Sequence, residues 1–454
     1  MNPEIESAAG RVAGGLPSCK HAGKNWAFFV VMAFWSALLL VNLMDFAPSV
    51  TFRGVRFVGI DFDQYYAAGV AAADGLWTEM YPESSKFVKG RRPAEAPYKP
   101  GLSEDLSRRG AAVRTKNIYP PPTALLFRPL AAWNFTVAQR LFVAFLFLCV
   151  AAFLWLLFDE CLFWGIPARA ANIVVLLAGT GLPMTESVML ANMTPAIGLC
   201  GLLVVRGVRN GKPLPTVLGF AVAGLTKGFS AVWIPALFIR RRWKTVAVGA
   251  LAGLAVLAAA VAAGAGPDVW REYVSEVLPA SRGNLYRIGD SNLAVPSFLA
   301  WTFGWSEVPA RLSRLLSCVQ LALVVSGFAM AWRIGERRSG DADAAVAVSL
   351  LLATTVFQSF STVCWPHYSV NILPFVPAAA AICRNRRFAF GTVLFGFALT
   401  WFPIGNALKY LTGGYIFGFG RFFGYMIVVC WAECELIRLV AKRGEAGENT
   451  GSAA

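Results

Sequence analysis

The sequence predicts an all-α polytopic membrane protein, on three observations. Only 15% of the 454 residues are charged and 57% are hydrophobic, whereas a soluble protein carries about 25% charged residues. The mean hydropathy is +0.56, and several apolar runs approach the roughly 20 residues that a helix needs to cross a bilayer. The runs lack the polar–apolar alternation of membrane β-strands.

The formal net charge of +15 does not indicate nucleic acid, because the basic residues gather in short loops between apolar runs. Such loops usually face the cytoplasm. The nine cysteines show no paired spacing for disulfides or a metal, so we interpret them as small hydrophobic residues.

The two ends of the chain are polar. Residues 1–25 are expected to form a cytoplasmic tail, and residues 442–454 a disordered cytoplasmic tail. Residues 26–441 then form one integral membrane domain. Its first apolar run, about 26–48, is long and lacks a small-residue cleavage pattern, so it is expected to be a retained span.

Residues 49–118 are the longest polar stretch and are expected to form the first outer loop. The loop contains Asp61 and Asp63, and a basic insert at about residues 86–116. Two interpretations of the insert stay open: it recruits an anionic acceptor or lipid headgroup, or it is a solvated loop that covers the site.

The remaining spans follow from hydropathy and loop charge. Spans at about 168–184 and 188–205 are joined by an expected tight outer turn at Thr185 and Glu186. The other expected spans are 137–158, 243–264, 311–333, 343–360, 369–383, 388–404 and 420–441.

One apolar segment, PTVLGFAVAGLTKGFSAVWIPALFIRRRWK, has basic residues on both flanks. A single span would place one basic flank outside, so we predict two short helices that meet at Lys227 and Gly228. Broken helices are tolerated where they line a polar cavity. A lysine at membrane depth is costly and usually faces a partner or such a cavity.

With these sides assigned, the unusual polar residues fall at or near the outer surface. They are Asp61, Asp63, Glu186, Lys227, Arg282, Arg287, Asn292 and His367. Solvated loop charges, helix caps or an interfacial belt position are the alternatives for single members. Together, cations that suit a lipid phosphate and a carboxylate that suits a general base indicate glycosyl transfer from a lipid-phosphate sugar.

Five segments, in chain order, resemble the motifs of glycosyltransferase family 87. They are DFDQYYAAGVAAADGLWTEMY, YPPPTALLFRPLA, GLTKGFSAVWIPALFIRRRW, NLAVPSF and CWPHY. The family belongs to the GT-C class of polytopic transferases, which use polyprenyl-phosphate sugars on the outer leaflet, and it includes α-1,2-mannosyltransferases. The resemblance implies a GT-C-like bundle of about 11–12 transmembrane helices with an outward-facing active site.

The resemblance also implies residue roles. Asp61 holds the first position of the first motif and is implied as the base, with Asp63 as the reserve candidate. The implied substrate-binding residues are Asp63, Tyr65, Tyr119, Lys227, Arg287, Asn292 and His367. The chain departs from the family pattern where Asn192 stands near an expected Gly-Gln pair and where Gly228, rather than proline, follows the lysine.

The expected reaction moves a hexose, with mannose in first place, from polyprenyl phosphate to a lipid-linked or glycan hydroxyl by one inverting displacement. No metal or other cofactor is expected, although Asp61 and Asp63 could hold a metal ion and metal dependence stays open. Membrane lipids are the expected partners. The expected location is the inner (plasma) membrane, with both termini cytoplasmic. A transporter or flippase, and a non-catalytic subunit, are the alternatives. Transporters more often show two related halves with a midplane site. The acceptor, the polyprenol length and the oligomeric state stay open.

Overall fold

The computed structural model describes residues 24–43, 60–81, 98–111, 117–279, 292, 294–306, 308–335, 340–361, 364–382 and 427–441. Throughout these ranges the regular secondary structure is helical, which confirms the all-α class. The structure does not describe the expected span at 388–404, residues 86–97 and 112–116 of the basic insert, residues 1–23 or the C-terminal tail 442–454.

The long helices build the body of the molecule. They are α2 (Trp26–Leu43), α6 (Phe135–Phe163), α7 (Ala168–Thr180), α9 (Thr194–Asn210), α10 (Pro213–Lys227), α12 (Trp243–Ala262), α16 (Ala310–Gly335) and α17 (Gly340–Ser359). The 3-10 helix η9 (Pro366–Phe375) continues into α18 (Val376–Ile382), and a further helix covers 427–441.

The shorter helices connect these or form a lobe at one end. They are α3 (Ile60–Ala73), η3 (Trp77–Glu79), α4 (Pro100–Arg108), α5 (Thr123–Phe127), η6 (Arg128–Ala132), α8 (Leu182–Met189), η7 (Phe229–Trp233), α11 (Pro235–Ile239), α13 (Pro267–Glu272), the π-helix η8 (Tyr273–Val277) and α15 (Val295–Thr302).

Five helical segments in the described ranges are long and apolar enough to cross a membrane: Phe135–Phe163, Ala168–Met189, Trp243–Ala262, Ala310–Ile334 and Ala342–Ser359. They coincide with spans that hydropathy predicts. The helices α12 and α16 bury little of their surface inside the protein, 11% and 17% of their apolar windows, as expected of helices that face lipid.

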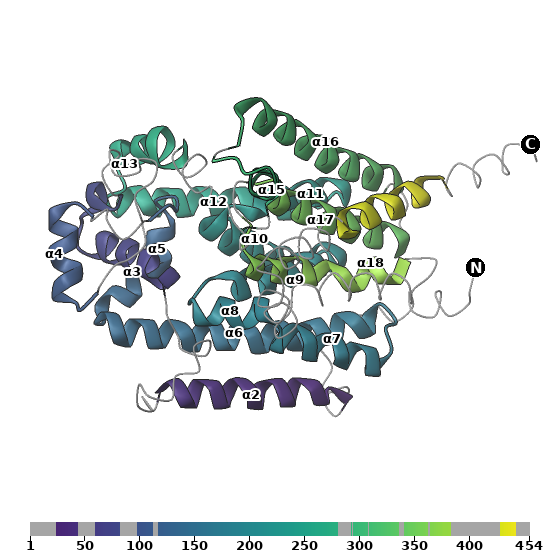
Figure 1. Ribbon diagram of the computed structural model, residues 1–454, viewed down its shortest axis with the longest axis horizontal. Helices are drawn as coiled ribbons and strands as arrows, with labels where there is room; N and C mark the ends of the chain where they lie inside the picture. Colours follow the sequence, from purple (N-terminus) through teal and green to yellow (C-terminus); the bar gives the residue numbers. More distant parts are fainter. Residues whose placement is uncertain are drawn as a thin grey trace, which may run out of the picture.

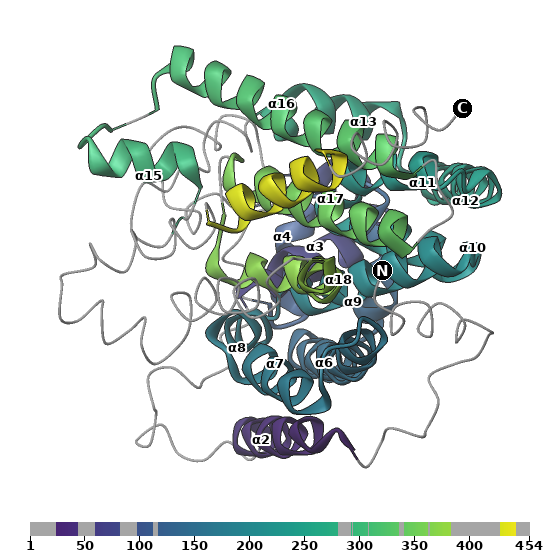
Figure 2. The ribbon, with the colours of Figure 1, turned by 90° about the vertical axis from the view of Figure 1, so that its right-hand side faces the viewer.

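The helices stack from one edge of the molecule to the other. In Figures 1 and 2, α2 lies at one edge, α6 and α7 lie next to it, α9 and α18 are central, and α16 lies at the opposite edge. The small residue Gly179 lets α2 approach α7 closely, since an added Cβ would lie 2.4 Å from Val31. Trp35 fixes this contact with a hydrogen bond of 2.9 Å to the Gly179 carbonyl.

The lobe at the left end of Figure 1 contains α3, α4, α5 and α13. Its centre is aromatic: Tyr65 stacks on Phe127 with ring centres 4.6 Å apart, and Phe62 stacks on Phe142 of α6 at 5.1 Å. Asn134 caps α6 by accepting a hydrogen bond from the Val137 amide. The lobe is therefore fixed to the start of a membrane-crossing helix.

The break expected at Lys227 and Gly228 is confirmed. The helix α10 ends at Lys227, and Gly228 follows with a φ of +66°, a left-handed conformation that glycine adopts without steric cost. The second half is a 3-10 turn, η7, followed by the five-residue α11.

The tight turn expected at Thr185 and Glu186 is wrong, because both residues lie inside α8. The chain turns at 190–193 instead. Ala191 adopts a φ of +51°, and the Asn192 amide donates to the Ser187 carbonyl at 2.8 Å. This is the hydrogen bond of a Schellman helix end, here with alanine in place of the usual glycine.

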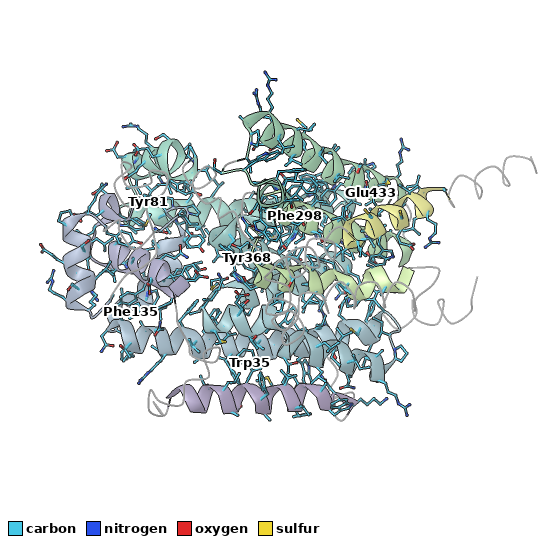
Figure 3. All side chains as sticks on the ribbon, viewed as in Figure 1. Trp35, Tyr81, Phe135, Phe298, Tyr368 and Glu433 are labelled. Carbon is cyan, nitrogen blue, oxygen red and sulfur yellow. The ribbon has the colours of Figure 1, made fainter. Side chains whose placement is uncertain are left out.

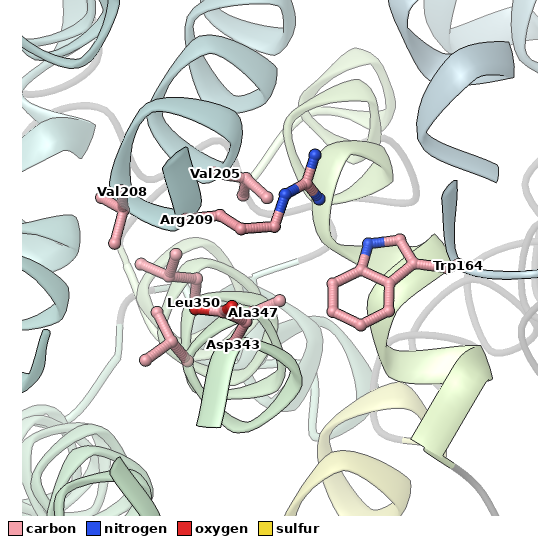
Figure 4. A pocket seen from close by; sticks show the side chains of 8 residues that line it. Trp164, Val205, Val208, Arg209, Asp343, Ala347 and Leu350 are labelled. Carbon is pink, nitrogen blue, oxygen red and sulfur yellow. The ribbon is translucent and has the colours of Figure 1, made fainter. Parts of the chain in front are cut away.

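The basic loops also join helices together. Arg209 pairs with the buried Glu160 through its two terminal guanidinium nitrogens, Nη1 and Nη2. Its Cζ lies 3.6 Å from the Phe163 ring centre. Trp164 donates to the same carboxylate at 2.9 Å. Figure 4 shows Arg209 and Trp164 among the residues that line a small pocket. The volume of this pocket is about 10 Å³. That volume holds one water at most, so this cluster is structural.

Candidate functional site

Asp61 lies at the junction of three segments that are far apart in the sequence. It stands in the first turn of α3, and its backbone amide donates to the Leu190 carbonyl at 3.0 Å. Its carboxylate Oδ2 accepts a hydrogen bond of 2.5 Å from Nδ2 of Asn192. The turn after α8 thus holds the start of α3 through one hydrogen bond to its backbone and one to its Asp61 side chain.

Asn192 connects Asp61 to Lys227. The Lys227 ammonium donates to Oδ1 of Asn192 at 2.9 Å, and the same oxygen accepts from the amide and the hydroxyl of Thr194 at 2.9 and 2.6 Å. Three donors on Oδ1 orient the amide so that Nδ2 faces Asp61. The carboxylate and the ammonium are therefore held by one amide that separates them.

Tyr368 forms one wall beside the ammonium. Its ring centre lies 4.2 Å from Nζ of Lys227, within the range of a cation–π contact. Figure 3 places Tyr368 near the centre of the molecule. The electrostatic surroundings of Tyr368 include Asp61 and Tyr119, so η9, α3 and the segment before α5 meet here.

Two tyrosines of the predicted site line it from the lobe. The hydroxyls of Tyr65 and Tyr119 lie 3.0 Å apart, and their rings stack at 5.1 Å. Burial raises the pKa of both phenols above its usual value, and the charge of Asp61 raises it further. Both therefore stay protonated, and since one hydroxyl donates to the other, the second O–H can donate elsewhere.

The other predicted residues make separate contacts. Asp63 is fully buried and lies close enough to Tyr98 to raise the pKa of that phenol, after the larger effect of burial. Asn292 accepts hydrogen bonds from the amides of Ala294 and Cys364 at 3.1 and 2.8 Å. It fastens the start of α15 to the CWPHY segment.

His367 is buried next to Tyr368, with ring centres 4.8 Å apart. Its Nδ1 lies 3.8 Å from the Glu186 carboxylate. His367 therefore contacts both Glu186 and Tyr368. Arg282 and Arg287 lie outside the described residues.

Two contributors were missed as site residues. Asn192 appears in the sequence only as a departure from a motif, and Tyr368 only as a neighbour of His367. The signal that could have found Asn192 was its place as the one amide between two apolar helices. Tyr368 could have been found only from the fold, since it reaches Lys227 across 141 residues.

The fold and this site define an integral membrane protein that holds a carboxylate and an ammonium on one amide, in a tyrosine-lined position between its helices and its end lobe. The sequence model of glycosyltransferase family 87 matches residues 117–366. Since the match covers more than half of the 454 residues, the chain belongs to glycosyltransferase family 87.

The matched range includes Tyr119, Asn192 and Lys227 but starts after Asp61 and ends just before His367. The place of Asp61 in the site thus rests on its hydrogen bonds to Leu190 and Asn192. No curated protein matches the chain.

Proposed function

We propose that this glycosyltransferase moves a hexose, with mannose the first to test, from a polyprenyl-phosphate donor to a hydroxyl of a lipid-linked or glycan acceptor. The observation that carries the proposal is the Asp61–Asn192–Lys227 arrangement. A carboxylate accepts a proton from an attacking hydroxyl, and a nearby ammonium stabilises a phosphate that leaves. Both groups are needed within one site.

In the proposed reaction the acceptor hydroxyl hydrogen-bonds to Asp61 and attacks the anomeric carbon. The new carbon–oxygen bond forms as the bond to the phosphate oxygen breaks, and the proton passes to the Asp61 carboxylate. Lys227 attracts the departing polyprenyl phosphate. Tyr65 and Tyr119 remain protonated, and the hydroxyl that does not donate to the other supplies a hydrogen bond to a sugar hydroxyl. One displacement inverts the anomeric centre, so a β-linked donor gives an α-linked product.

Asn192 has the task of holding the base and the cation apart. Direct pairing of Asp61 and Lys227 would leave each group neutralised by the other and less available to substrate. The amide satisfies one hydrogen bond of each and leaves their remaining donors and acceptors for the reactants.

We also propose that the site faces the outer side of a plasma membrane, with both termini in the cytoplasm. The distribution of basic loops supports this orientation. His367 and Arg287 are proposed to contact the donor phosphate or orient the acceptor as the substrates enter.

The test is sugar transfer by the full-length protein in reconstituted vesicles. Labelled polyprenyl-phosphate mannose and a membrane lipid extract are supplied to the wild type, Asp61→Asn and Asp63→Asn, with equal amounts of folded protein. We expect a labelled lipid or glycan product, its loss with Asp61→Asn, and its retention with Asp63→Asn. Equal transfer by wild type and Asp61→Asn would remove Asp61 as the base. Absence of transfer from every polyprenyl-phosphate hexose offered would overturn the donor class.

A further inference from the structure

A second polar feature lies at the other end of α3 from Asp61. An open pocket of about 660 Å³ is formed where the ends of α3 and α4 meet α5 and η6. Ala73, which lines the pocket, comes twelve positions after Asp61 in α3. Twelve positions of an α-helix span about 18 Å. The pocket is therefore distinct from the site described above. Its lining includes Asp74, Arg109, Leu125, Arg128, Pro129 and Ala132.

One wall is supplied by the basic insert of the first loop. Arg109, which follows α4, donates to both carboxylate oxygens of Asp74 at 3.1 and 2.8 Å. It also donates to the Ala131 carbonyl, and its own carbonyl accepts from the Phe135 amide at 3.0 Å. These bonds offset the charge of Asp74 and fix the insert to the start of α6.

Arg128 supplies the remaining positive charge. Its side chain is exposed and makes no hydrogen bond or ion pair with any part of the chain that the structure describes. A guanidinium presents a planar set of donors that matches the oxygens of a phosphate. Beside it, Leu125 and Pro129 offer an apolar floor.

The position of the pocket in the chain suits the height of lipid headgroups. It immediately precedes α6, the longest membrane-crossing helix among the described residues. Trp133 is 52% exposed just before α6 begins, as an interfacial tryptophan is, and Leu141, Phe145 and Leu148 are exposed further along the helix. A ligand in the pocket can therefore keep its phosphate in water and its chains in the bilayer.

We propose that this pocket binds the phosphate headgroup of an anionic membrane lipid, with Arg128 as the phosphate ligand and Arg109 and Asp74 as its fixed wall. The inference goes beyond the proposed function and does not depend on it. It gives the basic insert a role as part of a lipid site about 18 Å along α3 from Asp61.

The test follows thermal unfolding of the full-length protein in detergent micelles. The additives are dioctanoyl phosphatidylglycerol, dioctanoylglycerol without phosphate, and inorganic phosphate. We expect phosphatidylglycerol alone to raise the unfolding midpoint of the wild type, because only it combines the charge with the chains. With Arg128→Gln, half of the maximal shift should require at least about tenfold more lipid, the loss expected for one charged hydrogen bond.

Arg140→Gln is the matched control, since Arg140 is exposed on α6 but does not line the pocket. Arg140→Gln should respond as the wild type does. For Arg128→Lys, the lipid concentration that gives half of the maximal shift should lie between those of the wild type and Arg128→Gln. Equal responses of Arg128→Gln and the wild type would overturn the proposal. An equal shift with dioctanoylglycerol would exclude recognition of phosphate, and an equal shift with inorganic phosphate would exclude a lipid as the ligand.

Discussion

Asp61 and Asp63 lie on opposite faces of α3, although one residue separates them in the sequence. Positions i and i+2 of a helix differ by about 200° around its axis. The contacts agree with this geometry, because Asp61 is bonded to Asn192 whereas Asp63 is fully buried near Tyr98. The two carboxylates are therefore not interchangeable.

The first prediction concerns stability. Asp63→Ala should lower the free energy of unfolding by about 1–3 kcal/mol, because it leaves buried groups without their partner. Asp61→Asn should leave stability within about 0.5 kcal/mol of the wild type, because its side chain is part-exposed and keeps its shape. Unfolding midpoints of the two variants and the wild type, measured in the same detergent, test both expectations. A larger loss with Asp61→Asn would contradict the assignment.

A second prediction uses an isosteric change at the bridge. Asn192→Asp places a carboxylate oxygen against Oδ2 of Asp61, at an atom pair now 2.5 Å apart. Two carboxyl groups this close cannot both ionise without strong repulsion. The acidic limb of the pH–activity profile should move to higher pH, while turnover on the alkaline side is partly retained. An unshifted limb would show that Asn192 does not contact the ionised base.

The third prediction tests the cation. Lys227→Gln should lower kcat by about 100-fold, the typical loss when one group that stabilises developing charge is removed. Lys227→Arg should restore only part of the activity, because it keeps a cation beside Asn192 and the Tyr368 ring but presents its donors in a rigid planar fork. Lys212→Gln is the control, since Lys212 is exposed. Wild-type kcat in Lys227→Gln would exclude a role in phosphate departure.

A fourth prediction follows from the buried tyrosines of the lobe. Burial raises the pKa of Tyr65, Tyr81, Tyr98 and Tyr119. A folded-state pKa above the unfolded value of about 10 means that the unfolded chain loses these protons first. The stability contribution is therefore complete below about pH 10 and is lost as pH rises further. Unfolding midpoints from pH 8 to 11 should fall steeply above 10, and less steeply for Tyr65→Phe.

The fifth prediction concerns the turn that places Asn192. Ala191→Gly should stabilise the protein by about 0.5–1 kcal/mol, because glycine removes the steric cost of the left-handed φ but gains freedom in the unfolded chain. Ala223→Gly, within the helical part of α10, should destabilise by about 1 kcal/mol. Chemical or thermal unfolding of the pair gives the comparison. Destabilisation by both changes would contradict the strain at Ala191.

The sequence was sufficient to predict those features of the fold that depend on a short stretch of neighbouring residues. Hydropathy located the long helices, and the basic flanks together with Gly228 located the end of α10. The turn at Ala191 could not be located, because alanine is not a residue that predicts a left-handed turn. The turn was predicted at Thr185 and Glu186 instead, because they are polar. Asn292 was expected to line the site. Its bond from the Ala294 amide is a local turn contact, but its bond from the Cys364 amide depends on a tertiary contact that no spacing reveals.

The helix α6 contains 29 residues and is therefore about 43 Å long. The hydrocarbon layer is about 30 Å thick, so α6 must tilt strongly or extend beyond it. Because the lobe with Asp61 is fixed to the first turn of α6, the height of Asp61 above the acyl chains depends on that mismatch. The thickness of the bilayer would then set how far the proposed lipid-linked sugar must extend from the membrane to reach Asp61.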